Sequence, residues 1–290
     1  MVKTIRFNIG SFSKATQSNL AARTKTDYDI NLRWFRHFID ASKDASTGWT
    51  EMTSAPSKDL TPVTAAAAVD PFRPSEYTGL LMRVLKSRAH TFGRGKGLDM
   101  GMGSGVLLGM LGQLGVERLY GVDIDPDAVQ ATARLMKDLG LLDRTHLMHG
   151  SLWEPLGNEK FDVVVTNLPN FPATEPSDPD HSPFWSMGGD DGRRVLNPFL
   201  LGLRSHLLDN GVAFMTHNEF AGLAETEGVL ASHGLSVRSI MTTTVILHPS
   251  KSSLLGPEIR ARYMGVAMNQ LGPYEFADVR VLEIRPARIT

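Results

Sequence analysis

The sequence predicts an α/β fold, with a Rossmann-like, seven-stranded, mostly parallel sheet that ends in an antiparallel strand pair. From Gly97 onward, short apolar runs alternate with amphipathic segments of helical length. Strands separated by such helices form right-handed parallel crossovers. The last two apolar runs lack a full-length helical pattern between them, which predicts that they pair antiparallel. We therefore expect strands near 97–101, 118–122, 144–149, 161–166, 211–217, 236–247 and 276–285, and helices near 104–114, 126–139, 193–207 and 220–233.

The N-terminal part differs in charge from the rest of the chain. Residues 1–60 hold nine Lys/Arg and six Asp/Glu, a balance of +3, which leaves 21 of 30 and 25 of 31 to the remainder, a balance of −4. Apolar residues recur at helical spacing within residues 26–42 and predict one amphipathic helix there. We expect a helical N-terminal lid or recognition segment over residues 1–62 and the main domain over residues 63–290. A helix with Ser75 as its N-cap should open that domain.

Composition and charge exclude several classes of protein. The chain of 290 residues is 42% hydrophobic and has a formal net charge of −1, so it has no global positive field for a nucleic-acid backbone. It contains no cysteine, which excludes disulfides and thiolate zinc sites. No apolar run approaches the roughly 20 residues of a membrane span, and residues 1–10 lack the apolar block of a signal peptide. We expect a cytoplasmic protein without nucleic-acid or membrane partners.

A glycine-rich segment after the first expected strand is the strongest sign of a ligand site. Its sequence is Asp99-Met100-Gly101-Met102-Gly103-Ser104-Gly105. Glycines at alternate positions let the backbone pass close to a bulky ligand at the carboxyl edge of the sheet, and Asp99 projects from the strand end. The dinucleotide fingerprint requires a glycine at the sixth position counted from Gly101, where Val106 stands. The spacing therefore disfavours a nicotinamide cofactor.

A carboxylate follows the second expected strand. An acid at this position accepts hydrogen bonds from the two hydroxyls of a ribose, so Asp123 is the predicted ribose ligand. Ile124 should then cover one face of an attached base. Asp125 stands ahead of a proline and has the competing role of a helix N-cap. Further base contacts are expected after the third strand, at Ser151 and at the backbone amide of Leu152.

The fourth expected strand ends in Asn167-Leu168-Pro169-Asn170-Phe171. Together with Arg73-Pro74-Ser75-Glu76, the glycine-rich segment, Asp123 and Gly188-Gly189-Asp190-Asp191-Gly192, this segment resembles the class I S-adenosylmethionine-dependent methyltransferases. The resemblance covers about residues 68–250 and is closest to the release-factor glutamine N-methyltransferases and their amino-adenine relatives. The family pattern at this strand end is Asn-Pro-Pro-Tyr, so Leu168 and Asn170 depart from it. Without the family, Asn167 would be read as a turn residue ahead of Pro169.

The resemblance implies S-adenosylmethionine as the cofactor and assigns roles to the segments above. The Asn167 side chain and the Leu168 carbonyl would accept hydrogen bonds from the acceptor NH₂, with Pro169 completing the catalytic loop. Phe171 would take the place of the missing aromatic residue. The implied cofactor contacts are Asp99, Gly101, Gly103, Gly105, Asp123, Ile124, Ser151, Leu152 and Asn167, and the implied substrate contacts are Arg73, Asn170 and Phe171.

The expected reaction is in-line transfer of a methyl group to nitrogen or oxygen of a small-molecule acceptor, because the charge is near neutral and the stacking Tyr is absent. Two alternative enzyme activities fit the same residues. One methylates a protein glutamine or a nucleic-acid amino group, and the other is a non-methylating S-adenosylmethionine-consuming enzyme such as a cyclase that releases methylthioadenosine. A catalytically silent binding module is a further alternative. No metal is expected, since His146 and His149 fall on opposite faces of a strand, and the weak candidates for a base are Asp180, His181 and Glu219.

Overall fold

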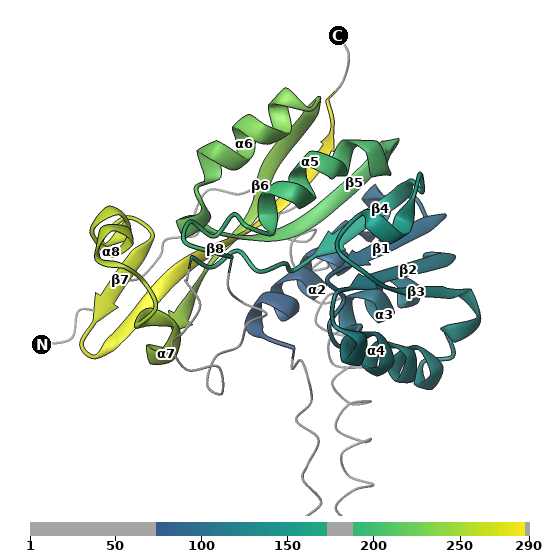
Figure 1. Cartoon of the computed structure of the whole chain (residues 1–290), viewed down its shortest axis with the longest axis horizontal. Coiled ribbons are helices and arrows are strands. Elements are labelled where there is room, and N and C mark those ends of the chain that lie inside the picture. The colour runs from purple at the N-terminus through teal and green to yellow at the C-terminus, as the bar shows by residue number, and fades with distance from the viewer. Residues whose placement is uncertain (1–73, 173–187, 288–290) are drawn as a thin grey trace, which may run out of the picture. The chain divides into compact units, whose positions relative to one another are not determined.

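The computed structural model describes residues 74–172 and 188–287 (Figure 1). Arg73, the amphipathic helix expected within residues 26–42 and the proposed boundary at residue 62 all lie outside the described residues, as do Asp180 and His181. The division of the chain at residue 62 therefore stays a prediction.

An eight-stranded sheet forms the centre of the described domain. Its strands are β1 (Lys96–Met100), β2 (Arg118–Asp123), β3 (Thr145–His149), β4 (Phe161–Thr166), β5 (Leu207–Asn218), β6 (Leu235–Leu247), β7 (Met268–Leu271) and β8 (Tyr274–Pro286). The order is β3-β2-β1-β4-β5-β8-β6, with β7 paired to β8. β1 to β5 pair in parallel, whereas β8 is antiparallel to β5, β6 and β7. The predicted fold class is confirmed, and β7 is an additional strand that the sequence pattern did not reveal.

Helices cover both faces of this sheet (Figure 1). They are α2 (Glu76–Arg88), α3 (Val106–Gln113), α4 (Pro126–Asp138), α5 (Leu196–His206), α6 (Leu223–Ser232), α7 (Pro249–Ser252) and α8 (Pro257–Tyr263), and short 3₁₀ turns lie at Ala89–Thr91, Leu142–Arg144, Glu154–Leu156 and Glu219–Ala221. The helix expected after Ser75 is α2, and the Thr78 hydroxyl accepts a hydrogen bond of 3.3 Å from the Ser75 amide. No helix within the described residues is both long and apolar enough to cross a membrane.

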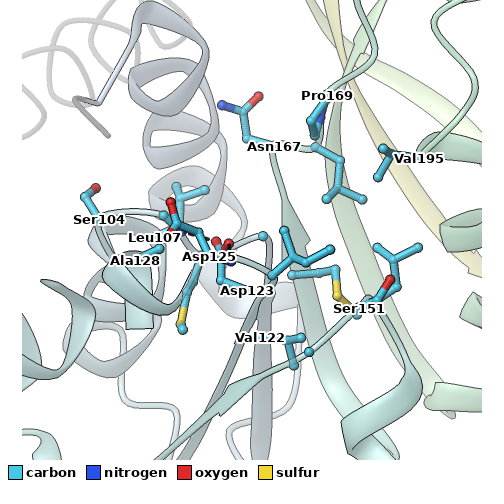
Figure 2. Close-up of a pocket in the computed structure, with 18 of the residues that line it drawn as sticks. Ser104, Leu107, Val122, Asp123, Asp125, Ala128, Ser151, Asn167, Pro169 and Val195 are labelled. Atoms are coloured by element: carbon cyan, nitrogen blue, oxygen red, sulfur yellow. Dashed lines mark hydrogen bonds between the residues drawn. The ribbon is translucent and has the colours of Figure 1, made fainter. Parts of the chain in front are cut away.

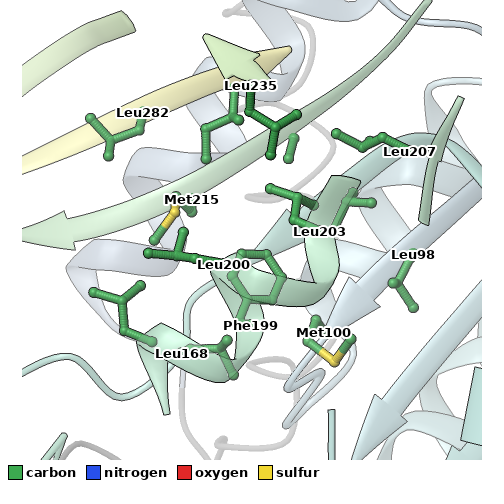
Figure 3. Close-up of a cluster of buried hydrophobic side chains, with 14 of the residues drawn as sticks. Leu98, Met100, Leu168, Phe199, Leu200, Leu203, Leu207, Met215, Leu235 and Leu282 are labelled. Carbon is green, nitrogen blue, oxygen red and sulfur yellow. The ribbon is translucent and has the colours of Figure 1, made fainter. Parts of the chain in front are cut away.

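The core has two halves because successive side chains of each central strand point to opposite faces. Val163 and Val165 of β4 pack with α2, α3 and α4, whereas Val164 packs with α5 and α6 on the other face. Figure 3 shows the second half, in which Phe199, Leu200 and Leu203 of α5 lie against the sheet. Burial on both faces explains why the central strands read as continuous apolar runs.

The long connection between β6 and β8 forms a small structure of its own. It contains α7, α8 and β7, and its apolar residues make a third buried cluster in which Phe171 and Phe220 join Leu247, Leu255 and Met268. Phe171 lies five residues after the end of β4, so this connection packs against the segment that contains Asn167. The elaborated C-terminal loop therefore lies beside the carboxyl edge of the sheet.

Candidate active site

A cavity of about 510 Å³ lies at the carboxyl ends of β1, β2 and β4. Its lining comes from the glycine-rich segment after β1, the end of β2, the segment after β3 and the Asn167 segment, with additions from α2 and α5. Asn167 and Pro169 lie at one side and Asp123 and Ser151 at the other (Figure 2). The cavity thus joins the segments that the sequence singled out.

The three glycines of the loop serve different purposes. Gly101 and Gly103 line the cavity with φ of 70° and 51°, and a Cβ on Gly101 would lie 2.9 Å from the Leu168 side chain. Gly105 does not line the cavity; it precedes α3 with φ of 77°, and a Cβ there would lie 2.6 Å from Cγ2 of Thr132. The expected cofactor contact at Gly105 is therefore corrected to a conformational requirement for the start of α3.

Asp123 lies at the end of β2 with its carboxylate fixed by backbone amides. Its Oδ2 accepts a hydrogen bond of 2.8 Å from the Gly103 amide, and its Oδ1 accepts one of 2.9 Å from the Asp125 amide. Burial raises the pKa of Asp123, and these hydrogen bonds oppose that shift. Each carboxylate oxygen keeps acceptor capacity, which suits vicinal hydroxyl groups. The side chain of Asp125 accepts a hydrogen bond of 2.8 Å from the Asp127 amide and so caps α4, although Asp125 also lines the cavity.

The other candidates for nucleoside contacts also line the cavity. Ile124 lines the cavity and is 71% exposed, so its side chain is available to cover one face of a base. Ser151 and Leu152 line the cavity from the segment after β3. Leu152 has a positive φ of 47°, the one such non-glycine residue in the described ranges. A strained conformation at this position fits a functional role of its backbone amide.

Asp99 lies below the cavity and not in its wall. The side chain is 1% exposed, and its Oδ2 accepts a hydrogen bond of 3.0 Å from the Leu108 amide of α3. Its Oδ1 has no hydrogen-bond partner in the part of the chain that the structure describes. Burial raises the pKa of Asp99 to about 8, so the group is neutral near pH 7. The expected contact with the cofactor is therefore corrected to a support for α3 beneath the loop.

The Asn167 segment is fixed to both neighbouring strands. The Thr166 hydroxyl donates to the Met100 carbonyl over 2.8 Å, and the Thr216 hydroxyl of β5 donates to Oδ1 of Asn167 over 2.5 Å. Asn167, Leu168 and Pro169 all line the cavity. The three residues predicted to be catalytic therefore share one wall, and Thr216 sets the orientation of the Asn167 amide.

Asn170 and Phe171 do not line the cavity, which corrects their expected role as substrate contacts inside it. Asn170 is buried; its Nδ2 donates to the Thr216 carbonyl over 2.9 Å, and its Oδ1 accepts from the Asn218 amide over 3.2 Å. Phe171 is 3% exposed and packs edge-on against Phe220, with ring centroids 5.8 Å apart. Both side chains are used to hold the segment against β5.

Several lining residues were missed from the sequence. Thr78 enters from α2, and Arg194, Val195 and Pro198 enter from the start of α5. Their positions depend on packing between distant segments, for which the sequence carries no local signal. Ser104 is different, because it stands between two of the loop glycines and was recognisable from that position. Met100 and Met102 of the same segment also line the cavity.

The described residues do not provide an evident base or metal ligand set. His217 is buried and does not line the cavity, and burial lowers its pKa to about 4, so it is neutral. Glu219 forms an ion pair with Arg280. No group of three or more His, Asp or Glu within residues 74–172 and 188–287 is arranged to hold a metal ion. Among the described residues, the cavity wall therefore offers groups that can bind and orient a ligand.

Comparisons with known proteins give relatives for this arrangement. A family model described as Ribosomal protein L11 methyltransferase (PrmA) matches residues 77–170. A Methanocaldococcus jannaschii protein whose name assigns it as a protein N5-glutamine methyltransferase is 31% identical over 143 residues, which cover 48% of this chain and 70% of that protein. A release factor glutamine methyltransferase of Geobacter sulfurreducens is 35% identical over 102 residues, which cover 33% of this chain and only 35% of that protein.

A solved structure from E. cuniculi shares the fold. It is described as a complex responsible for the methylation of the eRF1 translation termination factor, and it superposes with a TM-score of 0.51 at 19% identity, covering 76% of this chain and 100% of that chain. The expected small-molecule acceptor is wrong, because the relatives found are named for the methylation of proteins. The near-neutral charge that suggested it does not distinguish a metabolite from a protein surface.

We predict that Asp99→Asn changes the pH dependence of stability. The pKa of Asp99 is raised from 3.8 to about 8 on folding, so the folded state holds a proton that the unfolded state has lost, and stability falls as pH rises through this window. The asparagine variant lacks this loss. The variant should therefore gain about 3 kcal/mol in free energy of unfolding over the native chain when the pH rises from about 5 to about 8. Urea unfolding at each pH measures this difference. Parallel pH profiles would show that Asp99 is ionised in the folded protein.

We predict that Asp123→Ala weakens the binding of S-adenosylhomocysteine by about 1.5–3 kcal/mol, because charge-assisted hydrogen bonds to the ribose are lost. Isothermal titration calorimetry measures this change. Asp127→Ala is the matched control, since Asp127 is exposed near the same helix start and does not line the cavity. Equal affinities of the Asp123 variant and the native chain would refute the ribose assignment.

Proposed function

We propose a protein acceptor for this chain, which belongs to the S-adenosylmethionine-dependent methyltransferase family that includes protein N5-glutamine methyltransferases. The enzyme class and the cofactor predicted from the sequence are confirmed by this membership. The finer statement is our proposal: the methyl group passes to the side-chain amide nitrogen of a glutamine in a protein. The names of the relatives support a protein acceptor, and the geometry of the Asn167 segment supports an amide.

The observation that carries the proposal is the shared cavity wall of Asn167, Leu168 and Pro169, opposite Asp123 (Figure 2). A primary amide NH₂ has two donors, and the Asn167 Oδ1 and the Leu168 carbonyl are two acceptors on adjacent residues. Thr216 uses one acceptor position of Oδ1, and an amide oxygen has a second. The wall is thus complementary to a planar NH₂ group rather than to a lone hydroxyl.

The cofactor fits the opposite side of the cavity. The Asp123 carboxylate would bind the ribose hydroxyls, Ile124 would cover the base, and Gly101 and Gly103 leave room for the chain that carries the sulfonium. These residue roles are part of the proposal. Bound there, the cofactor supplies an electrophilic methyl group. A cavity of about 510 Å³ holds a ligand of nucleoside size.

The chain's own residues would accelerate the reaction by orientation. The C–N bond to the acceptor forms as the C–S bond breaks, S-adenosylhomocysteine leaves, and the amide proton passes to water. Hydrogen bonds from the NH₂ to Asn167 and Leu168 would hold the nitrogen lone pair toward the methyl group. Positioning of this kind contributes about 7 kcal/mol or more in favourable cases, so the absence of an evident base in the described wall is consistent with the reaction.

The proposal extends to the organisation of the chain and its location. We propose residues 63–290 as the catalytic domain and residues 1–62 as a lid or recognition segment for the acceptor. We also propose a cytoplasmic location, for which the absence of cysteine is consistent evidence.

The acceptor is testable with one incubation. The purified chain and S-[methyl-³H]adenosylmethionine are mixed with a cell extract that has been divided into macromolecules and a small-molecule filtrate. We expect label in the macromolecular fraction that resists nuclease and is released by protease, with a methylated glutamine identified by mass spectrometry. Label confined to the filtrate, or to nuclease-sensitive material, would refute the protein acceptor. Methylthioadenosine formed from the cofactor alone would identify a cyclase instead.

We predict that Asn167→Ala lowers the turnover number about 100-fold, because a misplaced acceptor nitrogen reacts far more slowly. The affinity for S-adenosylhomocysteine should stay nearly unchanged. Methyl transfer to the acceptor protein and calorimetry measure the two quantities separately. Asn158→Ala is the control, since Asn158 is exposed and does not line this cavity. Loss of cofactor affinity in the Asn167 variant would show that this residue serves the cofactor or the fold.

A further inference from the structure

The connection between β6 and β8 places an ammonium group over two aromatic rings. Lys251 of α7 has its Nζ 5.4 Å from the ring centroid of Tyr77 and 6.0 Å from that of Phe171. Both distances are within the range of cation–π attraction. The two rings come from α2 and from the segment after β4. Lys251 therefore links the connection between β6 and β8 to two elements that flank the cavity.

The ammonium of Lys251 forms no ion pair within residues 74–172 and 188–287, although the Glu76 carboxylate acts on it from a longer distance. Its contacts with the two rings are its side-chain interactions there, and neither an ion pair nor a hydrogen bond of Nζ is found. The side chain is half-buried, and burial lowers the pKa of Lys251, an effect that the nearby Glu76 carboxylate partly offsets. Aromatic faces supply no hydrogen-bond acceptor of ordinary strength, so three N–H donors remain available to a ligand.

The backbone that carries Lys251 is held firmly. The neighbouring Ser252 is buried and donates its hydroxyl to the Glu275 carboxylate. Arg260 donates to the Ser252 carbonyl over 2.7 Å and pairs with Glu275 over 2.7 Å. A fixed backbone together with the two ring contacts restricts the Lys251 side chain, so it loses less conformational freedom on binding a ligand than a fully solvated lysine would. This arrangement is more typical of a binding residue than of a solvated surface lysine.

The position of Lys251 relates it to the acceptor side of the cavity. Phe171 stands four residues after Asn167, and Tyr77 is followed by Thr78, which lines the cavity. The cofactor side, formed by Asp123 and Ile124, belongs to other strands. A ligand group that reaches Lys251 therefore belongs to the acceptor rather than to the nucleoside.

We propose that Lys251 binds a carboxylate of the acceptor protein, from an acidic residue close in sequence to the methylated glutamine. This inference rests on the proposed protein acceptor. A carboxylate is favoured over a backbone carbonyl because a half-buried cation that forms no ion pair gains most from a full negative charge in direct contact. Lys251 is thus a specificity residue, and it takes no part in the transfer of the methyl group.

The first test requires no acceptor. Protein containing ¹³C-labelled lysine is titrated with sodium acetate at constant ionic strength, with chloride as the reference anion, and the Lys251 signal is assigned by its absence in Lys251→Arg. We expect a saturable shift of the Lys251 ¹³Cε signal that exceeds several-fold the shift of Lys137, which is exposed on α4. A Lys251 signal that moves no more than that of Lys137 would overturn the proposal.

The second test uses peptides with one central glutamine and with Glu or Gln at each flanking position in turn. Transfer of the ³H-methyl group is compared for the native chain, Lys251→Met, Lys251→Arg and the control Lys137→Met. We expect one flanking position at which Glu is preferred over Gln by about tenfold. The preference should fall to near one in Lys251→Met and persist in Lys251→Arg and Lys137→Met.

The two tests separate this inference from the proposed function. An active enzyme whose preference survives in Lys251→Met, or that shows no preference for Glu, overturns the role of Lys251 and leaves the glutamine acceptor intact. Transfer to no glutamine peptide or protein, with a normal acetate response of Lys251, overturns the acceptor and the recognition role with it. The acetate response then shows a carboxylate site that serves another ligand.

Discussion

The hydrogen bond from the Gly103 amide to the Asp123 carboxylate joins the loop after β1 to the end of β2. It fixes the loop in a form that leaves the cavity open, and it holds the carboxylate in the cavity wall. The same carboxylate accepts the Asp125 amide, and Asp125 in turn caps α4. One side chain therefore couples the glycine loop, the parallel pair β1 and β2, and the start of a helix. The carboxylate oxygens keep further acceptor positions, so this structural role is compatible with the proposed binding of ribose hydroxyls.

Short-range patterns in the sequence predicted the strands and helix caps that depend on neighbouring residues alone. The positions of β1 to β6 and β8 follow from apolar runs, and the N-cap role of Asp125 follows from its place ahead of Pro126. Asp99 shows the limit of such reasoning. Its place at a strand end led us to expect a cofactor contact, but its side chain is buried beneath the loop, where burial keeps it neutral near pH 7. The alternation of side chains along a strand does not show whether a side chain at the strand end lines the cavity or is buried beneath it.

The parts of the site that escaped prediction depend on contacts between distant segments. Thr78 reaches the cavity only because α2 packs against the sheet, and Thr216 meets Asn167 because β5 lies beside β4 in register. β7 has four residues, too few for a clear alternation, and it forms because β8 continues past the end of β5. The acceptor class was misjudged for another reason, since net charge reports on the whole surface and not on the group that enters the cavity.

The departure of Asn170 from the family pattern has a structural consequence. An aromatic residue at this position would stack on the proposed acceptor amide. Asn170 is instead turned inward, where it donates to the Thr216 carbonyl and accepts from the Asn218 amide of β5. That bonding fixes Thr216, which fixes the Asn167 amide. These hydrogen bonds orient the Asn167 segment before an acceptor binds. Stacking would then contribute less to holding the amide of the proposed acceptor. Discrimination between acceptors must then come from outside the Asn167 segment, and the nearest aromatic residue after it, Phe171, lies under Lys251 of the connection between β6 and β8.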